Sequence, residues 1–403
     1  MKNAIVSFND TATAFESRSD KDLKSAYRLF KIISFNWLVK ISPPFVHFAL
    51  WAHLPVKGII RSTIFHHFCG GETISDCQDT ISKLGNYNIG TILDYSVEGK
   101  KSEKDFNDAL NETLATITRA KGEKNIPFCV FKPSGFVRFS ILEKKVSGEQ
   151  LNVTEKNEFE NFYKRIEKIC EYAFENNVPV YIDAEESWTQ NIIDELAREQ
   201  MMKYNREKVI VYNTLQMYRT GRINYLNESI IHAKANNYQC GFKIVRGAYM
   251  EKERKRAALL KIQSPIQPDK ATTDKDYDQA LKIAIENIES IAICCGTHNE
   301  ESCLYLVELM NEKKLTNNNP HIWFSQLYGM SDHISYNLAK KGFNVSKYVP
   351  YGPVEGVLPY LIRRAQENTS VAGQTGRELS LIQEDICRRK NVRLKTNPDS
   401  YRD

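Results

Sequence analysis

Apolar, β-branched runs recur along the chain from about residue 88 onward, and polar or small residues follow each run. The runs that we interpret as strands are 89–94, 126–132, 178–183, 209–212, 241–246, 291–295, 321–326 and 345–350. Segments with apolar residues at helical spacing lie between them, such as 155–176, 192–204, 224–236, 277–289 and 301–313. Strands that alternate with helices imply parallel pairing with right-handed crossovers. Eight repeats therefore predict an α/β fold that closes into a (β/α)8 barrel of the TIM type, with an open doubly wound sheet as the alternative.

Helical additions are expected on both sides of the barrel. We predict an N-terminal helical segment over residues 1–75, the barrel over 76–375 and a C-terminal helical tail over 376–403. Lysines and prolines interrupt the apolar, aromatic stretch 32–60, so no run reaches the roughly 18 residues of a spanning helix. We expect this stretch to pack as helices over the barrel, and a membrane-surface face is the alternative.

Composition excludes several classes of function. The 55 Lys and Arg residues and 50 Asp and Glu residues are interspersed along the 403-residue chain, which lacks the concentrated basic stripe typical of nucleic-acid binding. Nine cysteines form no Cys-x-x-Cys pair, and their odd count predicts packing roles in a reducing compartment. The first ten residues have no uninterrupted apolar core and include an early acid, which predicts neither secretion nor import. We therefore expect a cytoplasmic protein.

Polar residues lie near the carboxyl ends of all eight predicted strands or just after them, where barrel enzymes place their sites. They are Asp94 and Glu98, then Lys132, Asp183 and Glu185, Asn213 and Gln216, then Lys243, Arg246 and Tyr249, Thr297 to Asn299, Gln326 and finally Tyr348. Buried polar groups need partners, so eight polar strand ends in succession predict a lined pocket at the mouth of the barrel.

Two adjacent arginines, Arg363 and Arg364, lie in a predicted helix after the last strand. Pro359 suits a first helical position, which would place Tyr360, both arginines and Glu367 in the first turns. Paired guanidiniums near a helix N-terminus suit a carboxylate, because each donates two parallel hydrogen bonds and the helix end adds positive potential. A solvated Arg363–Glu367 pair is the alternative, in the weaker orientation. The pattern predicts a small anionic substrate.

Two other chemistries fit the sequence less well. A metal-dependent barrel hydrolase is the less favoured alternative, because His298 is the one histidine at a predicted strand end and no His-Glu-x-x-His motif occurs. We therefore expect no metal site. Neither a phosphate loop nor a Gly-x-Gly-x-x-Gly motif is present, so any dinucleotide would have to lie in the barrel mouth.

Eight motifs, in order, resemble those of the proline dehydrogenase family over roughly residues 60 to 380. They are Ile-Leu-Asp-Tyr-Ser-Val-Glu98, Phe-Lys-Pro133, Tyr-Ile-Asp-Ala-Glu185, Tyr-Asn-Thr-Leu-Gln-Met-Tyr218, Val-Arg-Gly-Ala-Tyr249, Thr-His-Asn-Glu300, Ser-Gln-Leu-Tyr-Gly-Met330 and Tyr-Leu-Ile-Arg-Arg-Ala-Gln-Glu-Asn368. The chain looks more like the single-function eukaryotic-type enzyme than the corresponding domain of the bifunctional bacterial protein.

The resemblance implies FAD-dependent oxidation of L-proline to 1-pyrroline-5-carboxylate, the first step of proline catabolism to glutamate. Hydride would pass to flavin N5, and a quinone would reoxidise the flavin. It also implies peripheral contact at the inner face of a membrane. By resemblance, the substrate side would comprise Lys132, Asp183, Tyr249, Tyr348, Tyr360, Arg363 and Arg364, with Glu98 paired to Arg363. The FAD contacts would be Gln216, Lys243, Arg246, Gly247, Thr297, His298, Asn299, Gln326 and Glu367. Lys243 departs from the pattern, because the bifunctional enzymes carry arginine there.

A hydroxyproline dehydrogenase is the alternative within this resemblance. The family's proline enzymes carry tyrosine at the position of Tyr348, and its hydroxyproline enzymes carry a smaller residue. A bulky phenol leaves no room for a 4-hydroxyl group, and burying an unmatched hydroxyl costs about 1–3 kcal/mol. We therefore expect proline to be the preferred substrate.

Overall fold

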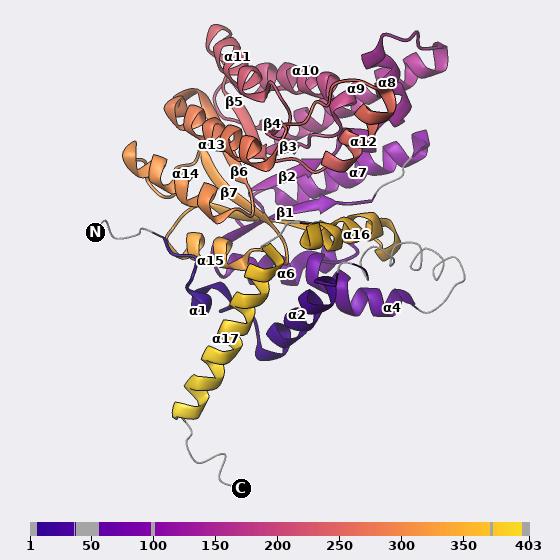
Figure 1. The fold of residues 1–403 in the computed structure, drawn as a ribbon. Helices are drawn as coiled ribbons and strands as arrows, with labels where there is room; N and C mark the ends of the chain where they lie inside the picture. The colour runs from indigo at the N-terminus through magenta and orange to yellow at the C-terminus, as the bar shows by residue number, and fades with distance from the viewer. Residues whose placement is uncertain (1–5, 36, 38–55, 98–100, 371–373, 397–403) are drawn as a thin grey trace.

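Eight parallel strands form a closed barrel in sequential order, which confirms the predicted (β/α)8 fold (Figure 1). The computed structural model describes residues 6–35, 37, 56–97, 101–370 and 374–396. The strands are β1 Ile89–Tyr95, β2 Phe128–Phe131, β3 Val180–Ile182, β4 Val211–Gln216, β5 Cys240–Val245, β6 Ile291–Gly296, β7 Ile322–Leu327 and β8 Val345–Tyr351. Strand β4 continues four residues beyond the predicted end, and this extension brings Gln216 into the sheet.

The barrel interior has an apolar aromatic layer. Tyr181 stacks on Phe128 with 4.6 Å between ring centroids, and Trp323 meets Phe128 edge-on at 5.0 Å. Side chains alternate between the two faces of a strand, so Asp183 faces the same side of the sheet as Tyr181, and Lys132 the same side as Phe128. A polar layer therefore lies above the aromatic layer, at the carboxyl ends of the strands.

Helices surround the barrel on its outer face (Figure 1). They are α6 Gln78–Gly85, α7 Glu103–Ala120, η3 Pro133–Gly135, α8 Phe139–Ser147, α9 Val153–Glu175, α10 Ser187–Tyr204, α11 Arg222–Ala235, α12 Met250–Leu260, α13 Lys270–Glu286, η4 Ile288–Ser290, α14 Glu300–Glu312 and α15 Asp332–Lys340. All five predicted helices are present. Side-chain caps define several starts; in α9, for example, Asn152 and Glu155 form a reciprocal capping box.

Helix α16, Val354–Ser370, begins earlier than predicted. The prediction that Pro359 is the first helical residue is wrong: the helix starts directly after Pro353, whose carbonyl accepts hydrogen bonds from the backbone N–H groups of Gly356 and Val357. Pro359 lies inside the helix, where its ring removes one backbone hydrogen bond. Burial of Val357 and of its apolar neighbours on α16 stabilises the continuous helix. Arg363 therefore lies mid-helix, and the potential of a helix N-terminus does not act on the paired arginines.

The N-terminal elements and the last helix share a second apolar core. These elements are α1 Thr11–Ala14, α2 Asp20–Ile33, α4 Val56–Ile60, η1 Arg61–Phe65, α5 His66–Phe68, η2 Ser75–Cys77 and α17 Gln374–Thr396. Phe15, Phe30, Phe68 and Leu381 are buried in this core beside the buried face of α16. Figure 1 shows α16 between the barrel and the helices α2 and α4.

Most of the stretch 32–60 lies outside the described residues, so the predicted packing of that stretch and the domain boundaries remain predictions. Among the described helices, none is long and apolar enough to cross a membrane. The nine cysteines are free thiols, eight of them buried, and only Cys387 is exposed.

Candidate active site

A chain of ion pairs crosses the mouth of the barrel. Lys132 donates to both carboxylate oxygens of Asp94, at 2.9 and 3.1 Å, and its ammonium lies 3.9 Å from Asp183. Lys243 donates to the other oxygen of Asp183 and, at 2.6 Å, to the phenol oxygen of Tyr348. The sequence places these five residues on β1, β2, β3, β5 and β8 or directly after them, and the closed barrel brings their side chains together.

Two members of this cluster, Asp94 and Tyr348, have shifted pKa values. Burial opposes ionisation of Asp94, but the nearby Lys132 ammonium and the hydrogen bonds from Lys132 and Ser96 outweigh burial and hold its pKa below the usual value. Burial, together with the charge of Asp183, raises the pKa of Tyr348 well above 10. Tyr348 is therefore a neutral phenol that accepts a hydrogen bond from Lys243, and its ring presents a flat wall to the mouth.

The paired arginines lie on α16, the helix that follows β8. Arg364 is buried, and its guanidinium lies 5.1 Å from the centre of the Tyr360 ring, within cation–π range. Burial raises the pKa of Tyr249, and the charges of Glu185 and Glu186 add to the increase. The charge of Arg363 acts in the opposite direction, so Arg363 and Tyr249 lie within electrostatic reach of each other. The predicted partner Glu98 lies outside the described residues.

On the β4 to β6 side, Arg246 is held by three bonds. It donates to Asp274 at 2.7 Å, to Thr297 at 2.7 Å and to Ser302 at 3.0 Å, and its guanidinium lies 4.4 Å from the centre of the Tyr277 ring. Because these bonds fix the guanidinium on all sides, Arg246 joins the end of β5 to the loop after β6.

The backbone next to Arg246 requires glycine. Gly247 has a φ of +135°, and a Cβ at this position would lie 2.4 Å from the Tyr218 ring. The amide of Gln216 donates to the carbonyl of Glu185 at 2.6 Å, and its oxygen accepts from the backbone N–H of Ala248 at 3.3 Å. Gln216 therefore supports the turns after β3 and β5.

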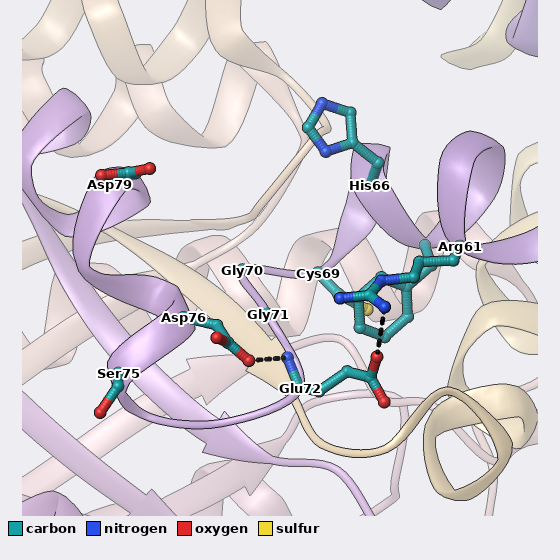
Figure 2. Close-up of a pocket in the computed structure, with 10 residues that line it drawn as sticks. Arg61, His66, Cys69, Gly70, Gly71, Glu72, Ser75, Asp76 and Asp79 are labelled. Carbon is teal, nitrogen blue, oxygen red and sulfur yellow. Dashed lines mark hydrogen bonds and ion pairs between the residues drawn. The ribbon is translucent and has the colours of Figure 1, made fainter. Parts of the chain in front are cut away.

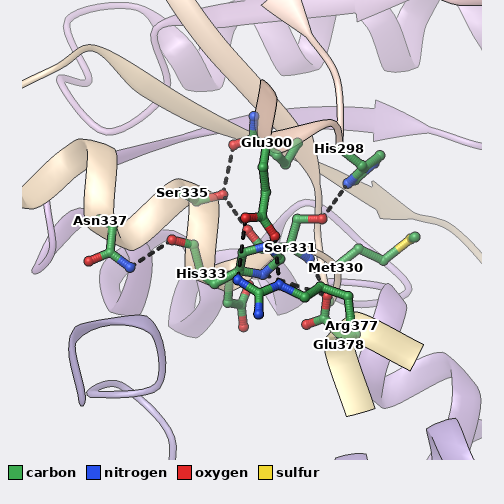
Figure 3. A network of polar contacts seen from close by, with 12 residues as sticks. His298, Glu300, Met330, Ser331, His333, Ser335, Asn337, Arg377 and Glu378 are labelled. Carbon is green, nitrogen blue, oxygen red and sulfur yellow. Dashed lines mark hydrogen bonds and ion pairs between the residues drawn. The ribbon is translucent and has the colours of Figure 1, made fainter. Parts of the chain in front are cut away.

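The loop after β6 carries His298, which is half-buried in a positive environment. Burial, together with the charges of Lys347 and Arg364, lowers its pKa to about 3, so the ring is neutral near pH 7. Its Nδ1 lies 2.9 Å from the hydroxyl of Ser331 (Figure 3). The neighbouring Asn299 caps α14 by accepting from the N–H of Ser302 at 2.8 Å.

Gln326 faces away from the interior of the barrel. Its amide donates to the carbonyl of Thr297 at 3.1 Å, and its oxygen accepts from Ser335 of α15 at 2.8 Å. In this structure it supports the Thr297 loop from behind. The side chain of Glu367 lies outside the described part of the chain.

Two residues near the site were not assigned to substrate or cofactor by sequence reasoning, although Glu185 was counted in the predicted pocket. Glu185 is buried, and its carboxyl accepts from the backbone N–H of Ser134 at 2.7 Å. Its burial raises its pKa to about 7. Ser331, which contacts His298, was not singled out; its place directly before an acid and an apolar helical stretch is a helix-start signal that could have indicated it.

Two hollows lie apart from the ion-pair cluster. A cavity of about 340 Å³ between Arg61 and Asp79 is lined by Glu72, Asp76 and neighbouring residues (Figure 2). A second hollow, of about 720 Å³, opens at the amino ends of the strands, beside Tyr212 and Trp323. No predicted site residue lines either hollow. Among the described residues, no three His, Cys, Asp or Glu side chains are grouped to hold a metal ion.

The closed barrel with a charged mouth at the carboxyl ends of its strands defines a barrel enzyme. A family model described as "Proline dehydrogenase" matches residues 77–377, and the chain belongs to this family of oxidoreductases.

Known relatives and structures are consistent with this family. The chain is 34% identical to proline dehydrogenase 1, mitochondrial, of Dictyostelium discoideum, over 94% of this chain and 74% of that one. It is 28% identical to a hydroxyproline dehydrogenase of Xenopus laevis, over 95% of this chain and 90% of that one. Its fold matches proline utilization A (PutA) from Bdellovibrio bacteriovorus with a TM-score of 0.71 at 19% identity, over 89% of this chain and 38% of that one. The chain thus spans little more than a third of that larger protein.

Proposed function

We propose that the chain is an FAD-dependent proline dehydrogenase that oxidises L-proline to 1-pyrroline-5-carboxylate. The observation that carries the proposal is the mouth itself, where Lys132, Asp183, Lys243 and Tyr348 form one cluster, and where Asp183 and Arg363 both act on the pKa of Tyr249. Family membership supports the same chemistry, since members of the proline dehydrogenase family are flavoenzymes.

In this proposal, Arg363 and Arg364 hold the carboxylate of proline. A guanidinium gives a carboxylate two parallel hydrogen bonds, which fixes the orientation of the substrate as well as its position. Tyr249, Tyr348 and Tyr360 provide flat walls for the pyrrolidine ring. Hydride loss from the carbon next to nitrogen requires the ring to be held in one orientation, so these contacts select the reacting carbon.

Lys132, Asp183 and Lys243 set the charge around the bound amino acid. Proline reaches the site as a zwitterion, and hydride loss requires its amine to be neutral. Asp183 already accepts a bond from Lys243 and lies 3.9 Å from Lys132. In the proposal, a carboxylate oxygen of Asp183, held in place by these contacts, receives the amine proton.

The residues on the β4 to β6 side fit an anionic dinucleotide such as FAD. Arg246 supplies a guanidinium that is fixed in place and paired with Asp274, and Gly247 leaves the backbone open where a side chain would meet Tyr218. Arg246, Arg364 and Lys347 gather positive charge around the neutral His298, which suits a ligand with negative groups. The other proposed FAD contacts are Gln216, Lys243, Thr297, Asn299, Gln326 and Glu367. When bound, the flavin supplies the hydride acceptor, and a quinone accepts the electrons afterwards.

Hydroxyproline is the competing substrate, because one relative carries that name. In the structure, the phenol of Tyr348 is buried and bonded to Lys243 at 2.6 Å, so its ring is held in place at the wall of the mouth. This observation favours proline, because a fixed bulky ring restricts room for a 4-hydroxyl.

A direct comparison of substrates tests the proposal. The purified protein, supplied with FAD and an artificial electron acceptor, should show a higher kcat/KM for L-proline than for trans-4-hydroxy-L-proline. A higher value for hydroxyproline would transfer the assignment to hydroxyproline dehydrogenase. Inactivity with both amino acids would contradict the proposed function altogether.

The cellular setting belongs to the same proposal: a cytoplasmic protein with peripheral contact at the inner face of a membrane. Nine free thiols support a reducing compartment. Several relatives are named as mitochondrial, so a mitochondrial location is the alternative to the cytoplasmic one. Fractionation of the source cells with an antibody to this chain separates the two, and recovery with mitochondria would contradict the cytoplasmic assignment.

A further inference from the structure

The C-terminal helix α17 contacts the loops beside the mouth through two adjacent residues. Glu378 is buried, and its carboxylate accepts from the backbone N–H of Ser331 at 3.0 Å. Arg377 donates to Glu300 at 2.8 Å, and Glu300 also lies 3.1 Å from His333 (Figure 3). The helix therefore touches both the loop after β7 and the first residue of α14, which directly follows the His298 loop.

Ser331 has a backbone conformation that needs support. Its φ of +51° and ψ of 43° lie in the left-handed region, which costs a residue other than glycine roughly 1 kcal/mol or more. Two sets of bonds hold it there. Its carbonyl accepts from the N–H groups of Ile334 and Ser335 in the first turn of α15, and its own N–H donates to Glu378.

The same conformation places the hydroxyl of Ser331 2.9 Å from Nδ1 of His298. His298 is neutral, so one ring nitrogen carries a proton and the other is an acceptor. A fixed hydroxyl at Nδ1 holds the ring plane and limits how the second nitrogen can face a ligand. A continuous series of contacts thus runs from Glu378 through Ser331 to His298.

We propose that Glu378 of α17 is a positioning residue for the cofactor site, which acts by holding Ser331 so that its hydroxyl orients His298. The inference rests on the proposed function, because it takes His298 as a contact of FAD. The proposal gives the C-terminal helix α17 a role in FAD affinity, although this helix lies far along the chain from most of the barrel motifs.

Four variants of the full-length chain test this role. Glu378→Ala removes the acceptor for the Ser331 N–H, and Ser331→Ala removes the hydroxyl. Glu378→Gln keeps an acceptor oxygen and is the conservative variant. Arg389→Ala is the matched control on α17: Arg389 fastens the same helix to the N-terminal segment by donating to the carbonyls of Phe15 and Arg18, at 2.7 and 2.8 Å.

The first measurement is the dissociation constant of FAD, determined by fluorescence titration of the apoprotein. Glu378→Ala and Ser331→Ala should each weaken FAD binding on the order of tenfold, the size of one lost hydrogen bond. Glu378→Gln should stay within about threefold of the wild type, and Arg389→Ala should lower the melting temperature with FAD affinity nearly unchanged.

The second measurement is the ¹⁵N spectrum of His298, assigned with a His298→Asn variant. Its ring shifts should change in Glu378→Ala and in Ser331→Ala but not in Arg389→Ala. The inference would be overturned if Glu378→Ala and Arg389→Ala lost equal FAD affinity. It would also be overturned if FAD affinity were unchanged in both Glu378→Ala and Ser331→Ala. Either result would leave the proposed function intact. A wild-type protein that binds no FAD would overturn both.

Discussion

Replacing Glu185 with glutamine should stabilise the folded protein at alkaline pH. The side chain is 3% exposed, and its carboxyl accepts one hydrogen bond from the backbone N–H of Ser134. Burial is the main cause of its raised pKa, and the charge of Glu186 adds to it, while Ser134 and Lys132 act in the opposite direction. Glutamine keeps the shape and the acceptor oxygen but carries no charge at any pH.

The size of the effect follows from the pKa of Glu185 in the two states. In the unfolded chain its carboxyl ionises near 4.5, and in the fold it stays protonated up to about 7. The folded state therefore binds an extra proton between these values, and its stability falls as the pH rises through this window. The interval from 4.5 to about 7, at 1.36 kcal/mol per pH unit, amounts to about 3 kcal/mol. Glu185→Gln should match the wild type below pH 4.5 and exceed it by up to this amount above pH 7.

Urea unfolding at pH 4.5 and pH 8 measures the difference. Glu158→Gln is a suitable control, because Glu158 is also buried but accepts from Arg138 at 2.8 Å; loss of this ion pair should destabilise the fold. A Glu185→Gln variant that is less stable than the wild type at pH 8, or whose advantage does not change with pH, would refute the reasoning.

Three further outcomes are expected. Arg364→Met and Arg363→Met, made separately, should each raise the KM for L-proline severely while FAD stays bound. The reason is that a desolvated carboxylate that loses a bidentate partner loses about 2–5 kcal/mol of binding free energy. Near-normal KM values in both variants would exclude the carboxylate-binding role of these arginines. Tyr348→Ser should reduce the ratio of kcat/KM for L-proline to kcat/KM for trans-4-hydroxy-L-proline, mainly by lowering proline turnover. Steady-state kinetics with both substrates checks this. His67 is half-buried, and desolvation lowers its pKa to about 3, so the wild type should become less stable as the pH falls below 6.5. The unfolding free energy of His67→Gln should therefore depend less steeply on pH between 6.5 and about 4, and equal slopes would contradict this.

The barrel could be predicted from the sequence because its signal is local and repeated. Each strand is a short β-branched or apolar run buried on both faces, and each is followed by a segment with helical spacing. The start of α16 could not be predicted in the same way. Pro359 suits a helix start by itself, but burial of Val357 and Leu361 in the second core stabilises the turns before and after it. Tertiary packing thus outweighs the local preference of proline.

The ion-pair cluster of the candidate site was predictable as far as the strand ends locate it, and the roles of its residues remain predictions. Lys132 and Asp183 directly follow strands, Lys243 lies within β5, and the closed barrel brings all three into one cluster. The orientation of Gln326 could not be read in this way, because adjacent strand residues face opposite sides and a shift of one position reverses the outcome. The contact between Ser331 and Glu378 joins segments whose proximity depends on how α17 packs, which no local pattern encodes.

Anaerobic reduction of the bound flavin by proline tests the central claim most directly. The purified chain, reconstituted with FAD, should show the visible absorption of a bound flavin, and addition of L-proline should bleach it as 1-pyrroline-5-carboxylate forms, detected with o-aminobenzaldehyde. The Arg364→Met variant should keep the flavin spectrum but need far more proline for the same bleaching. A protein that binds no FAD, or whose bound flavin stays oxidised with excess L-proline, would contradict the account.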